Sequence, residues 1–272
     1  MADKRVTPAR ADLAASHLKG QVEAPRFVEG ETFSVRVGRA SLRVRPSDDA
    51  AQDSELLHGE SFTVYDRAHG WAWGQAASDR YVGYVKEDAL SAPFAREARV
   101  SALMAPVFAH PDLKTPVRDL LPLSASVPVL GRDGDYVNIG SGFVHQRHLA
   151  AEGKKDFVAV AQRFLGVAYV WGGKTAAGLD CSGLIQTALQ AVGKAAPRDT
   201  DMMEKALGEP TRIADVRRGD LVFWIGHMGV MLDAQNLLHA NAFHMLVAIE
   251  PLAEAIGRIE KVAGPVTSVK RL

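Results

Sequence analysis

The stretch GLDCSGLIQTALQAVG (residues 178–193) decides how the last part of the chain folds, because a glycine turn gives way in it to an amphipathic helix. The apolar residues that would face the core recur at helical spacing: Leu184, Ile185, Ala188, Leu189 and Val192. Gly193 follows as the predicted helix stop. Cys181, the only cysteine in 272 residues, lies in the first turn.

The segments around this helix predict an α+β domain over residues 151–272. Upstream, DFVAVAQRFLG (156–166) has helical spacing and ends at a glycine. Its predicted core residues are Phe157, Val160, Ala161, Phe164 and Leu165. Downstream, four short apolar runs predict strands: DLVFW (220–224), HMGVMLD (227–233), NLLHANA (236–242) and MLVAIE (245–250). Helices followed by an antiparallel run of strands are typical of the α+β class.

The part of the chain before this domain predicts two small β-barrels. From residue 33 to 150, short β-rich runs such as WAWGQA, YVGYV and VPVL alternate with turn residues. Segment 55–90 also lies over segment 119–149 as a weak internal repeat, in which an acid-Leu-Leu start leads to a Gly-aromatic-Val strand. We therefore expect barrels over residues 32–92 and 97–150.

Composition limits the possible partners. The 32 Lys and Arg residues balance 32 Asp and Glu residues, so we expect neither a nucleic-acid nor a membrane partner. Residues 1–31 are polar and contain two prolines, which predicts an arm or a lead-in helix. They lack the apolar core of a secretory signal, and no apolar run approaches the ~20 residues of a membrane span, so we expect a cytoplasmic protein. We also expect a monomer without metal or cofactor.

Cys181 is the candidate nucleophile. In the first turn of a helix, unpaired amide N–H groups and the helix dipole favour the thiolate, which is the attacking species. His227 begins a predicted strand, and a hairpin with DAQN as its turn would bring His239 beside it. A histidine whose second nitrogen is held by a polar group keeps the right tautomer for a base. Cys181, His227 and His239 therefore form a candidate triad, with His244 as an alternative to His239.

Two other interpretations of these residues are open. A lone cysteine is more often a buried small hydrophobe, and histidines on strands are often simply hydrogen-bonded. A zinc site built from one cysteine and two histidines is the second, but the chain lacks CxxC and HxxxH spacing for it. The joint occurrence of the three residues favours catalysis.

Six motifs resemble, in order and in spacing, those of the NlpC/P60 cysteine peptidases: YVWGG (169–173), LDCSGL (179–184), PRDT (197–200), RRGDLVFW (217–224), GHMGVML (226–232) and LLHANA (237–242). The resemblance covers about residues 151–272 and implies a papain-like α+β fold with both histidines on the sheet. The upstream repeats resemble two bacterial SH3 domains. The whole chain is similar to γ-D-glutamyl-L-diamino-acid endopeptidases, which trim murein peptides, and the identity of the diamino acid is left open.

This resemblance implies a free peptide substrate that begins L-Ala-γ-D-Glu and is cut before the diamino acid. The amino terminus of such a peptide is a cation, and Asp180 matches the carboxylate that receives it, although Asp180 is equally placed to cap the helix. Tyr169 matches a tyrosine whose hydroxyl helps to bind the substrate or the oxyanion; a packed aromatic ring is the simpler alternative. Ser182 and the Cys181 amide would add polar contacts.

The resemblance implies further substrate contacts outside this motif. Tyr81 matches a tyrosine that reaches over from the first barrel, and Glu60 is a candidate second carboxylate for the ammonium, with Glu55 as its alternative. An ordinary position on the barrel surface is the alternative interpretation of Tyr81 and Glu60, and for Glu60 it is the favoured one because Glu55 could serve instead. Asp199 and Thr200 follow the Pro-Arg motif and are expected to line the same subsite, where this sequence departs from the common PRTS form.

The chemistry we expect is acyl transfer to a thiol. His227 takes the proton of Cys181 or pairs with its thiolate, the sulfur attacks the γ-glutamyl carbonyl, and His239 orients His227. Losing His239 should cost ~10²-fold in rate. Three other functions fit the same residues: a wall-bound autolysin acting on intact peptidoglycan, a cysteine-based acyltransferase or amidase, and a binding module whose catalytic domain is inactive.

Overall fold

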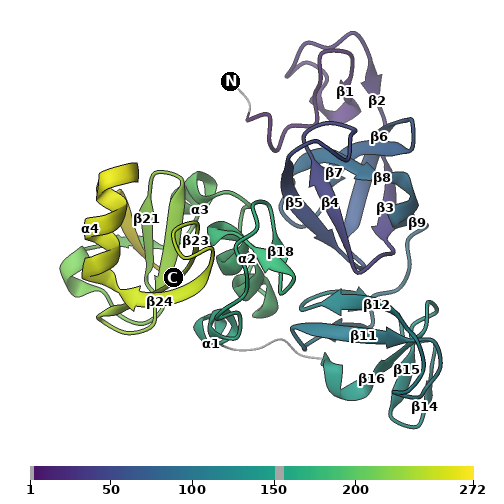
Figure 1. Cartoon of the computed structure of the whole chain (residues 1–272). Helices are drawn as coiled ribbons and strands as arrows, with labels where there is room; N and C mark the ends of the chain where they lie inside the picture. Colours follow the sequence, from purple (N-terminus) through teal and green to yellow (C-terminus); the bar gives the residue numbers. More distant parts are fainter. Residues whose placement is uncertain (1–2, 151–155) are drawn as a thin grey trace. The chain divides into compact units, whose positions relative to one another are not determined.

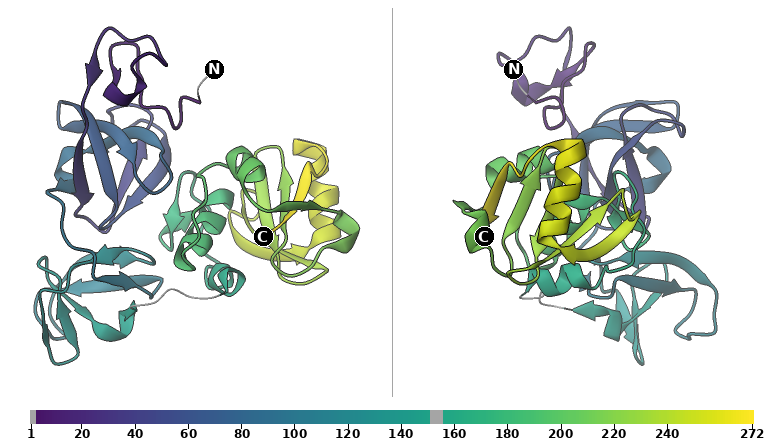
Figure 2. Two further views of the ribbon diagram at one scale, coloured as in Figure 1. Left: turned by 180° about the vertical axis from the view of Figure 1, so that it is seen from behind. Right: turned by 60° about the vertical axis from the view of Figure 1, so that its left-hand side comes forward.

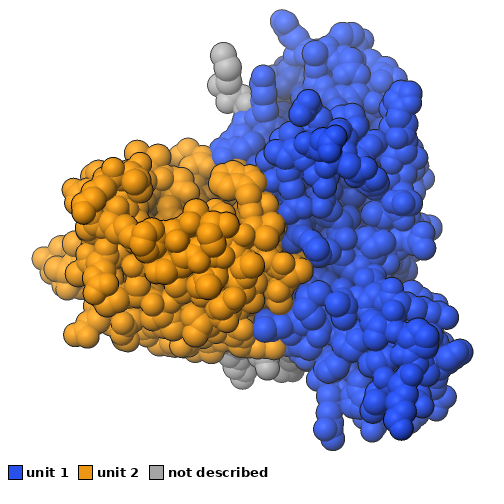
Figure 3. Space-filling view, viewed as in Figure 1, with its two compact units in different colours: residues 1–152 blue, residues 153–272 orange. Residues whose placement is uncertain are grey.

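The chain forms two compact units, residues 1–152 and 153–272 (Figures 1 and 3). The computed structural model describes residues 3–150 and 156–272. No helix within these described ranges is long and apolar enough to cross a membrane.

The N-terminal arm is tied to the first barrel through Arg10. The elements of the arm are β1 (Ala14–Ala15), η1 (Ser16–Leu18) and β2 (Phe27–Val28). Arg10 donates to Asp66 Oδ2 at 2.6 Å and lies 4.6 Å from the centre of the Trp73 ring. Of the two forms that the sequence allowed, the arm is therefore observed, with a single 3-10 turn in place of a lead-in helix.

Barrel 1 is a seven-stranded antiparallel sheet in the order β5-β4-β8-β7-β6-β3-β9. Its elements are β3 (Glu31–Val35), β4 (Arg39–Arg43), β5 (Gln52–Leu57), β6 (Ser61–Ala68), β7 (Trp71–Ala76), β8 (Val82–Lys86), η2 (Glu87–Ala89) and β9 (Leu90–Ser91). The predicted runs WAWGQA and YVGYV form β7 and β8, which pair with each other. Alternate side chains fill an apolar core that includes Phe62, Ala72 and Tyr81.

A second group of strands follows and has an apolar core of its own, which includes Val107 and Leu121. Its sheets have the orders β12-β11-β16-β15-β14 and β13-β10-β17. Its elements are β10 (Ala98–Val100), β11 (Met104–Phe108), β12 (Val117–Pro122), β13 (Ser126–Val127), β14 (Gly131–Asp133), β15 (Tyr136–Asn138), β16 (Phe143–His145), η3 (Gln146–His148) and β17 (Leu149–Ala150). The predicted strand VPVL is wrong beyond its first residue, because Pro128 has no N–H to donate to a ladder. Its assignment as a second SH3 domain stays a prediction.

A six-stranded antiparallel sheet, in the order β20-β25-β21-β22-β23-β24, forms the centre of the second unit. The strands are β20 (Glu209–Thr211), β21 (Leu221–Trp224), β22 (His227–Met231), β23 (Asn236–Asn241), β24 (Leu246–Pro251) and β25 (Ser268–Arg271), with a separate hairpin of β18 (Lys174–Thr175) and β19 (Gly178–Leu179). The helices are α1 (Phe157–Gln162), α2 (Cys181–Ala191), α3 (Thr200–Ala206), η4 (Ile213–Asp215) and α4 (Leu252–Ala263). The predicted α+β class and its four strands are confirmed.

Helix packing places the elements of the site. Helix α2 lies against β22 and β23 and also against α1. Helix α4, which runs along the sheet in Figure 2, packs Leu252, Ala255 and Ile259 into one cluster with Trp224 and Leu237 of the sheet. Helices α2 and α4 therefore both pack on the sheet that contains β22 and β23. Helix α2 contributes Cys181, and α4 contributes Arg258.

Helix α1 is shorter than the predicted span of 156–166. It ends at Gln162, and the chain continues in tighter turns in which Leu165 N donates to Gln162 O at 3.2 Å. This change of pitch keeps Phe164 buried but turns Leu165 outward, where it is 53% exposed. The prediction that Leu165 belongs to the core is therefore wrong.

Candidate active site

Cys181 is the first residue of α2 and is 6% exposed. Its sulfur lies 3.8 Å from Thr200 Oγ1 and 4.0 Å from the carbonyl oxygen of Gly226. The backbone N–H of Met228 is also close enough to lower the pKa of the thiol. Gly226 and Met228 flank His227 in the sequence, so the sulfur lies beside the start of β22.

The surroundings of Cys181 favour its thiol form. Burial and, second, the Asp180 carboxylate raise the pKa of Cys181 to about 11, whereas the hydroxyl of Thr200 and the N–H groups of Met228 and Ser182 offset only part of this rise. This direction opposes the thiolate expected at the helix start, because burial outweighs the favourable dipole. A base must take the proton before attack.

His227 and His239 contact each other across neighbouring strands, as the predicted hairpin requires. His227 Nε2 lies 2.8 Å from His239 Nδ1. Gly229 of β22 faces this pair: a Cβ atom built there would come within 3.0 Å of the Cβ of His239 and 2.8 Å of the Leu237 side chain. A larger residue at position 229 would push His239 away from His227.

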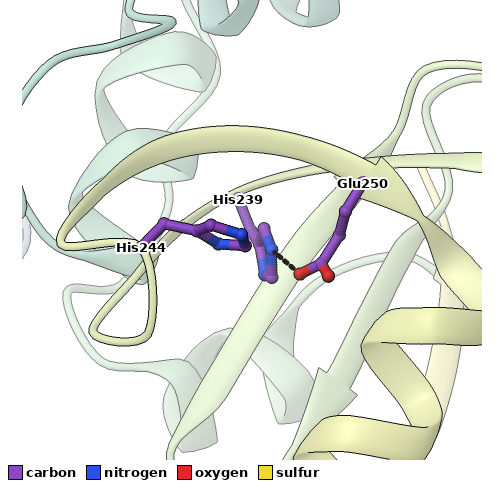
Figure 4. Close-up of side chains that lie close together, drawn as sticks. All are labelled: His239, His244 and Glu250. Carbon is purple, nitrogen blue, oxygen red and sulfur yellow. Dashed lines mark hydrogen bonds and ion pairs between the residues drawn. The ribbon is translucent and has the colours of Figure 1, made fainter.

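His239 makes a second contact through its other nitrogen, which lies 2.7 Å from Glu250 Oε1 (Figure 4). The same oxygen of Glu250 accepts a hydrogen bond from Arg258 of α4. The sequence reasoning missed Glu250. The signal was its place on the strand after His239: Glu250 pairs with Leu237, which lies two residues from His239 and therefore on the same face.

Both histidines are neutral at neutral pH. Burial, followed by His239 and Arg258, lowers the pKa of His227 to about 3, although Glu250 acts in the opposite direction. Burial, followed by Arg258 and His244, lowers the pKa of His239 to about 3. His227 is therefore available as a neutral base.

His244, the predicted alternative to His239, lies in the exposed turn after β23. Its Nδ1 is 3.0 Å from Asn241 Oδ1. One nitrogen or oxygen from each of His239, His244 and Glu250 would lie within 4.8 Å of the others, a set of donor types that suits a transition metal. Both nitrogens of His239 are engaged and Glu250 already holds Arg258, so these side chains fit a hydrogen-bonded chain better than a metal centre.

Asp180 and Arg198 form a buried ion pair under the nucleophile. Arg198, 1% exposed, donates to the two oxygens of Asp180 at 3.0 and 2.6 Å and to Ser182 Oγ at 2.8 Å. Asp180 also caps α2 by accepting from Gly183 N at 2.7 Å, and it accepts from Gly172 N at 2.9 Å. The capping role is thus observed. The ammonium contact stays a prediction, in which the substrate would have to compete with Arg198.

Arg198 is a second residue that the sequence reasoning missed. It belongs to the PRDT motif, from which only Asp199 and Thr200 were selected as candidates. The presence of Arg198 in one motif and of Asp180 in another could have suggested an ion pair. However, arginine side chains in proteins are mostly exposed. Only the fold shows that this one is enclosed.

Two family models match parts of the chain. Residues 166–259 match the model of the NlpC/P60 family, and residues 42–90 match the bacterial dipeptidyl-peptidase SH3 domain. Residues 166–259 form an NlpC/P60 domain. The chain is therefore a cysteine peptidase. Cys181, its only cysteine, stays the predicted nucleophile.

Two curated relatives are informative about the whole chain. A γ-D-glutamyl-L-lysine dipeptidyl-peptidase of Bacillus cereus is 25% identical over 78% of this chain and 74% of its own length. A Bacillus subtilis protein of the same name is 28% identical over 48% of this chain and 49% of its own. Among solved structures, an NlpC/P60 family protein from Bacillus cereus matches with a TM-score of 0.75 at 19% identity, covering 89% of this chain and 99% of the other. That structural likeness extends the shared fold beyond the NlpC/P60 domain.

The other predicted contacts within the NlpC/P60 domain lie close to the sulfur. Tyr169 is half-buried, and burial raises the pKa of its hydroxyl well above the ordinary value, with Cys181 and Asp180 raising it further. Thr200 is buried, contacts the sulfur and begins α3, with Asp199 at the N-cap position. Their roles in substrate binding stay predictions.

The predicted residues of barrel 1 belong to the other unit. Tyr81 is 4% exposed and part of the barrel core, so an ordinary surface position does not explain it. Glu60 accepts a hydrogen bond from Leu57 N at 3.2 Å. Glu55, its alternative, is 1% exposed and forms an ion pair with Arg39. A contact between these residues and a substrate of the NlpC/P60 domain stays a prediction.

Proposed function

We propose that this protein hydrolyses the γ-D-glutamyl bond to the diamino acid in free murein peptides with an unblocked L-Ala. The observation that carries the proposal is the pairing of His227 with His239 beside the buried thiol of Cys181. The bond is taken from the names of the two Bacillus relatives. The requirement for a free amino terminus and a role in peptide recycling are part of the proposal, as is the cytoplasmic location that the sequence predicts.

The first half of the reaction forms a thioester. Neutral His227 takes the proton of the Cys181 thiol as the sulfur attacks the γ-carbonyl of D-glutamate. The N–H groups at the start of α2 are suited to stabilise the oxyanion of the tetrahedral intermediate. His227, now an imidazolium, gives its proton to the amine of the diamino acid, which leaves.

The second half releases the dipeptide. A water molecule gives one proton to His227 and attacks the thioester carbonyl, and the intermediate breaks the carbon–sulfur bond. The proton then returns from His227 to the sulfur. The products are the L-Ala-D-Glu dipeptide with a free γ-carboxylate and the restored thiol.

Three substrates test the proposal: L-Ala-γ-D-Glu-meso-diaminopimelate, the same peptide acetylated on its amino terminus, and intact sacculi. We expect cleavage of the free peptide alone, with its two products identified by mass spectrometry, and no turnover by Cys181→Ala. Replacing diaminopimelate by L-lysine shows which diamino acid is preferred. Equal cleavage of the acetylated peptide, or release of peptides from sacculi, would overturn the free-peptide specificity.

A mass spectrum also separates hydrolysis from acyl transfer. A dipeptide joined to an added amine, in place of the free dipeptide, would identify an acyltransferase. Complete inactivity toward all three substrates, with Cys181 unreactive toward iodoacetamide, would point to a binding module.

A further inference from the structure

Glu250, His239 and His227 form a chain of short contacts that leads from α4 toward the nucleophile. Glu250 Oε1 lies 2.7 Å from His239 Nε2, and His239 Nδ1 lies 2.8 Å from His227 Nε2. Arg258 donates to the same oxygen of Glu250 from the other side. His239 is completely buried and Glu250 largely so, which limits competition from water.

The protonation of this chain follows from what each atom can donate. An ionised carboxylate only accepts, so the nitrogen of His239 that faces Glu250 carries its proton. A neutral imidazole has one N–H, so His239 Nδ1 accepts, and His227 Nε2 must then be the donor between the two rings. The lone pair of neutral His227 is left on Nδ1.

We propose that Glu250, held in place by Arg258, is a positioning residue that sets the tautomers of both histidines and so leaves His227 Nδ1 as the base for Cys181. Glu250 acts through His239 and touches neither the sulfur nor the scissile bond. The inference rests on the proposed roles of Cys181 and His227. The inference adds the carboxylate of Glu250 to the predicted arrangement of Cys181, His227 and His239.

The identity of the side chain at position 250 matters because an amide has nearly the same shape as a carboxylate but can also donate a hydrogen bond. If glutamine at this position turns its NH₂ group toward His239 Nε2, that nitrogen accepts, and the hydrogen bond from Arg258 is lost because the NH₂ group cannot accept it. His239 would carry its proton on Nδ1 and donate to His227, whose remaining proton would lie on Nδ1. No lone pair of His227 would then be available to the thiol. A wrong tautomer of the catalytic histidine lowers kcat by about 10⁴-fold in serine proteases.

Histidine-selective ¹⁵N labelling of the full chain tests the inference without a substrate. In the wild-type protein at pH 7, we expect both His227 and His239 as Nε2–H tautomers. In Glu250→Gln, we expect the Nδ1–H form to become populated in both rings. In the control Glu260→Gln, which changes an exposed carboxylate on α4, we expect wild-type tautomers. A wild-type His239 protonated on Nδ1 overturns the proposal, and this reading needs no variant to fold.

Reactivity is the second measurement. Because Cys181 is the only cysteine, alkylation by iodoacetamide reports on this sulfur alone. We expect Glu250→Gln to lower both the alkylation rate and kcat/KM at least roughly 10-fold, as removal of outer-shell partners of histidine does elsewhere. Values within twofold of the wild type at an unchanged melting temperature would overturn the proposal. Correct tautomers and alkylation in a protein that cleaves no peptide would instead refute the proposed substrate and leave the positioning role intact.

Discussion

Two carboxylate–guanidinium pairs of the second unit, one at the start of the helix that carries Cys181 and one beside His239, are built differently. Asp180 and Arg198 are 6% and 1% exposed, and both oxygens of Asp180 are occupied. In the second pair, the side chains of Glu250 and Arg258 are 11% and 24% exposed, and one oxygen of Glu250 serves both Arg258 and His239. The first pair fixes the start of the helix that carries Cys181, whereas the second bears on the protons of the histidines.

The degree of burial determines whether an ion pair mainly affects folding stability or the protonation of its neighbours. A fully enclosed pair is costly to break, because the remaining charge has lost its water and its partner. The Glu250–Arg258 pair is partly open to water on its Arg258 side, so breaking it should cost less folding free energy. We therefore expect changes on the Asp180 side to affect stability first, and changes on the Glu250 side to affect protonation first.

The largest effect is expected for Arg198→Met. It leaves Asp180 buried without its counter-charge, and the free energy of unfolding of the second unit should fall by about 3–5 kcal/mol. Hydrogen exchange of α2 peptides measures the loss. The matched control is Arg212→Gln, which breaks the exposed pair with Asp215 and should cost less than about 1 kcal/mol. Equal losses in the two variants would contradict the distinction between the pairs.

An intermediate effect is expected from pH. His227 and His239 have a folded pKa of about 3, below the ordinary value of 6.5, so the unfolded chain binds protons first as the pH falls. The stability they contribute is present above pH 6.5 and is lost between 6.5 and 3, with a slope of at most about 1.4 kcal/mol per pH unit for each histidine. Urea unfolding between pH 7 and 5 checks this. His239→Asn should have a shallower slope, and an identical slope would show that other groups cause the loss.

The smallest effect is expected for Arg258→Gln. Arg258 lowers the pKa of both His227 and His239, so its removal should raise them and shift the acid limb of kcat/KM upward by less than about one pH unit. The control is Lys261→Gln, which removes an exposed charge from the same helix and should leave the limb in place. A downward shift in Arg258→Gln would show that Glu250 loses its orientation when Arg258 is absent.

The candidate triad could be proposed from the sequence because each of its residues has a local signature. Cys181 follows a glycine turn at a helix start, and His227 and His239 fall on two runs joined by a short polar turn, so the adjacency of the histidines follows from the hairpin. The apolar spacing over residues 252–263 also indicates the helix α4 that carries Arg258.

The supporting residues could not be found in this way. Glu250 is one of 32 acidic residues, and only the register of β24 against β23 places it on the face of His239. Arg198 required knowledge of tertiary burial, since local spacing gives an arginine no reason to be enclosed. The exposure of Leu165 depended on where α1 ends, and helix ends are set by competing turns of similar energy.

The protonation state of Cys181 also determines how fast its sulfur reacts with oxidants. Peroxides and disulfides react with thiolates, and a thiol with a pKa of about 11 offers very little thiolate at neutral pH. The free enzyme should therefore resist oxidative inactivation. In the proposed mechanism, the sulfur of Cys181 becomes vulnerable mainly during the brief interval after His227 takes its proton and before it bonds to the peptide.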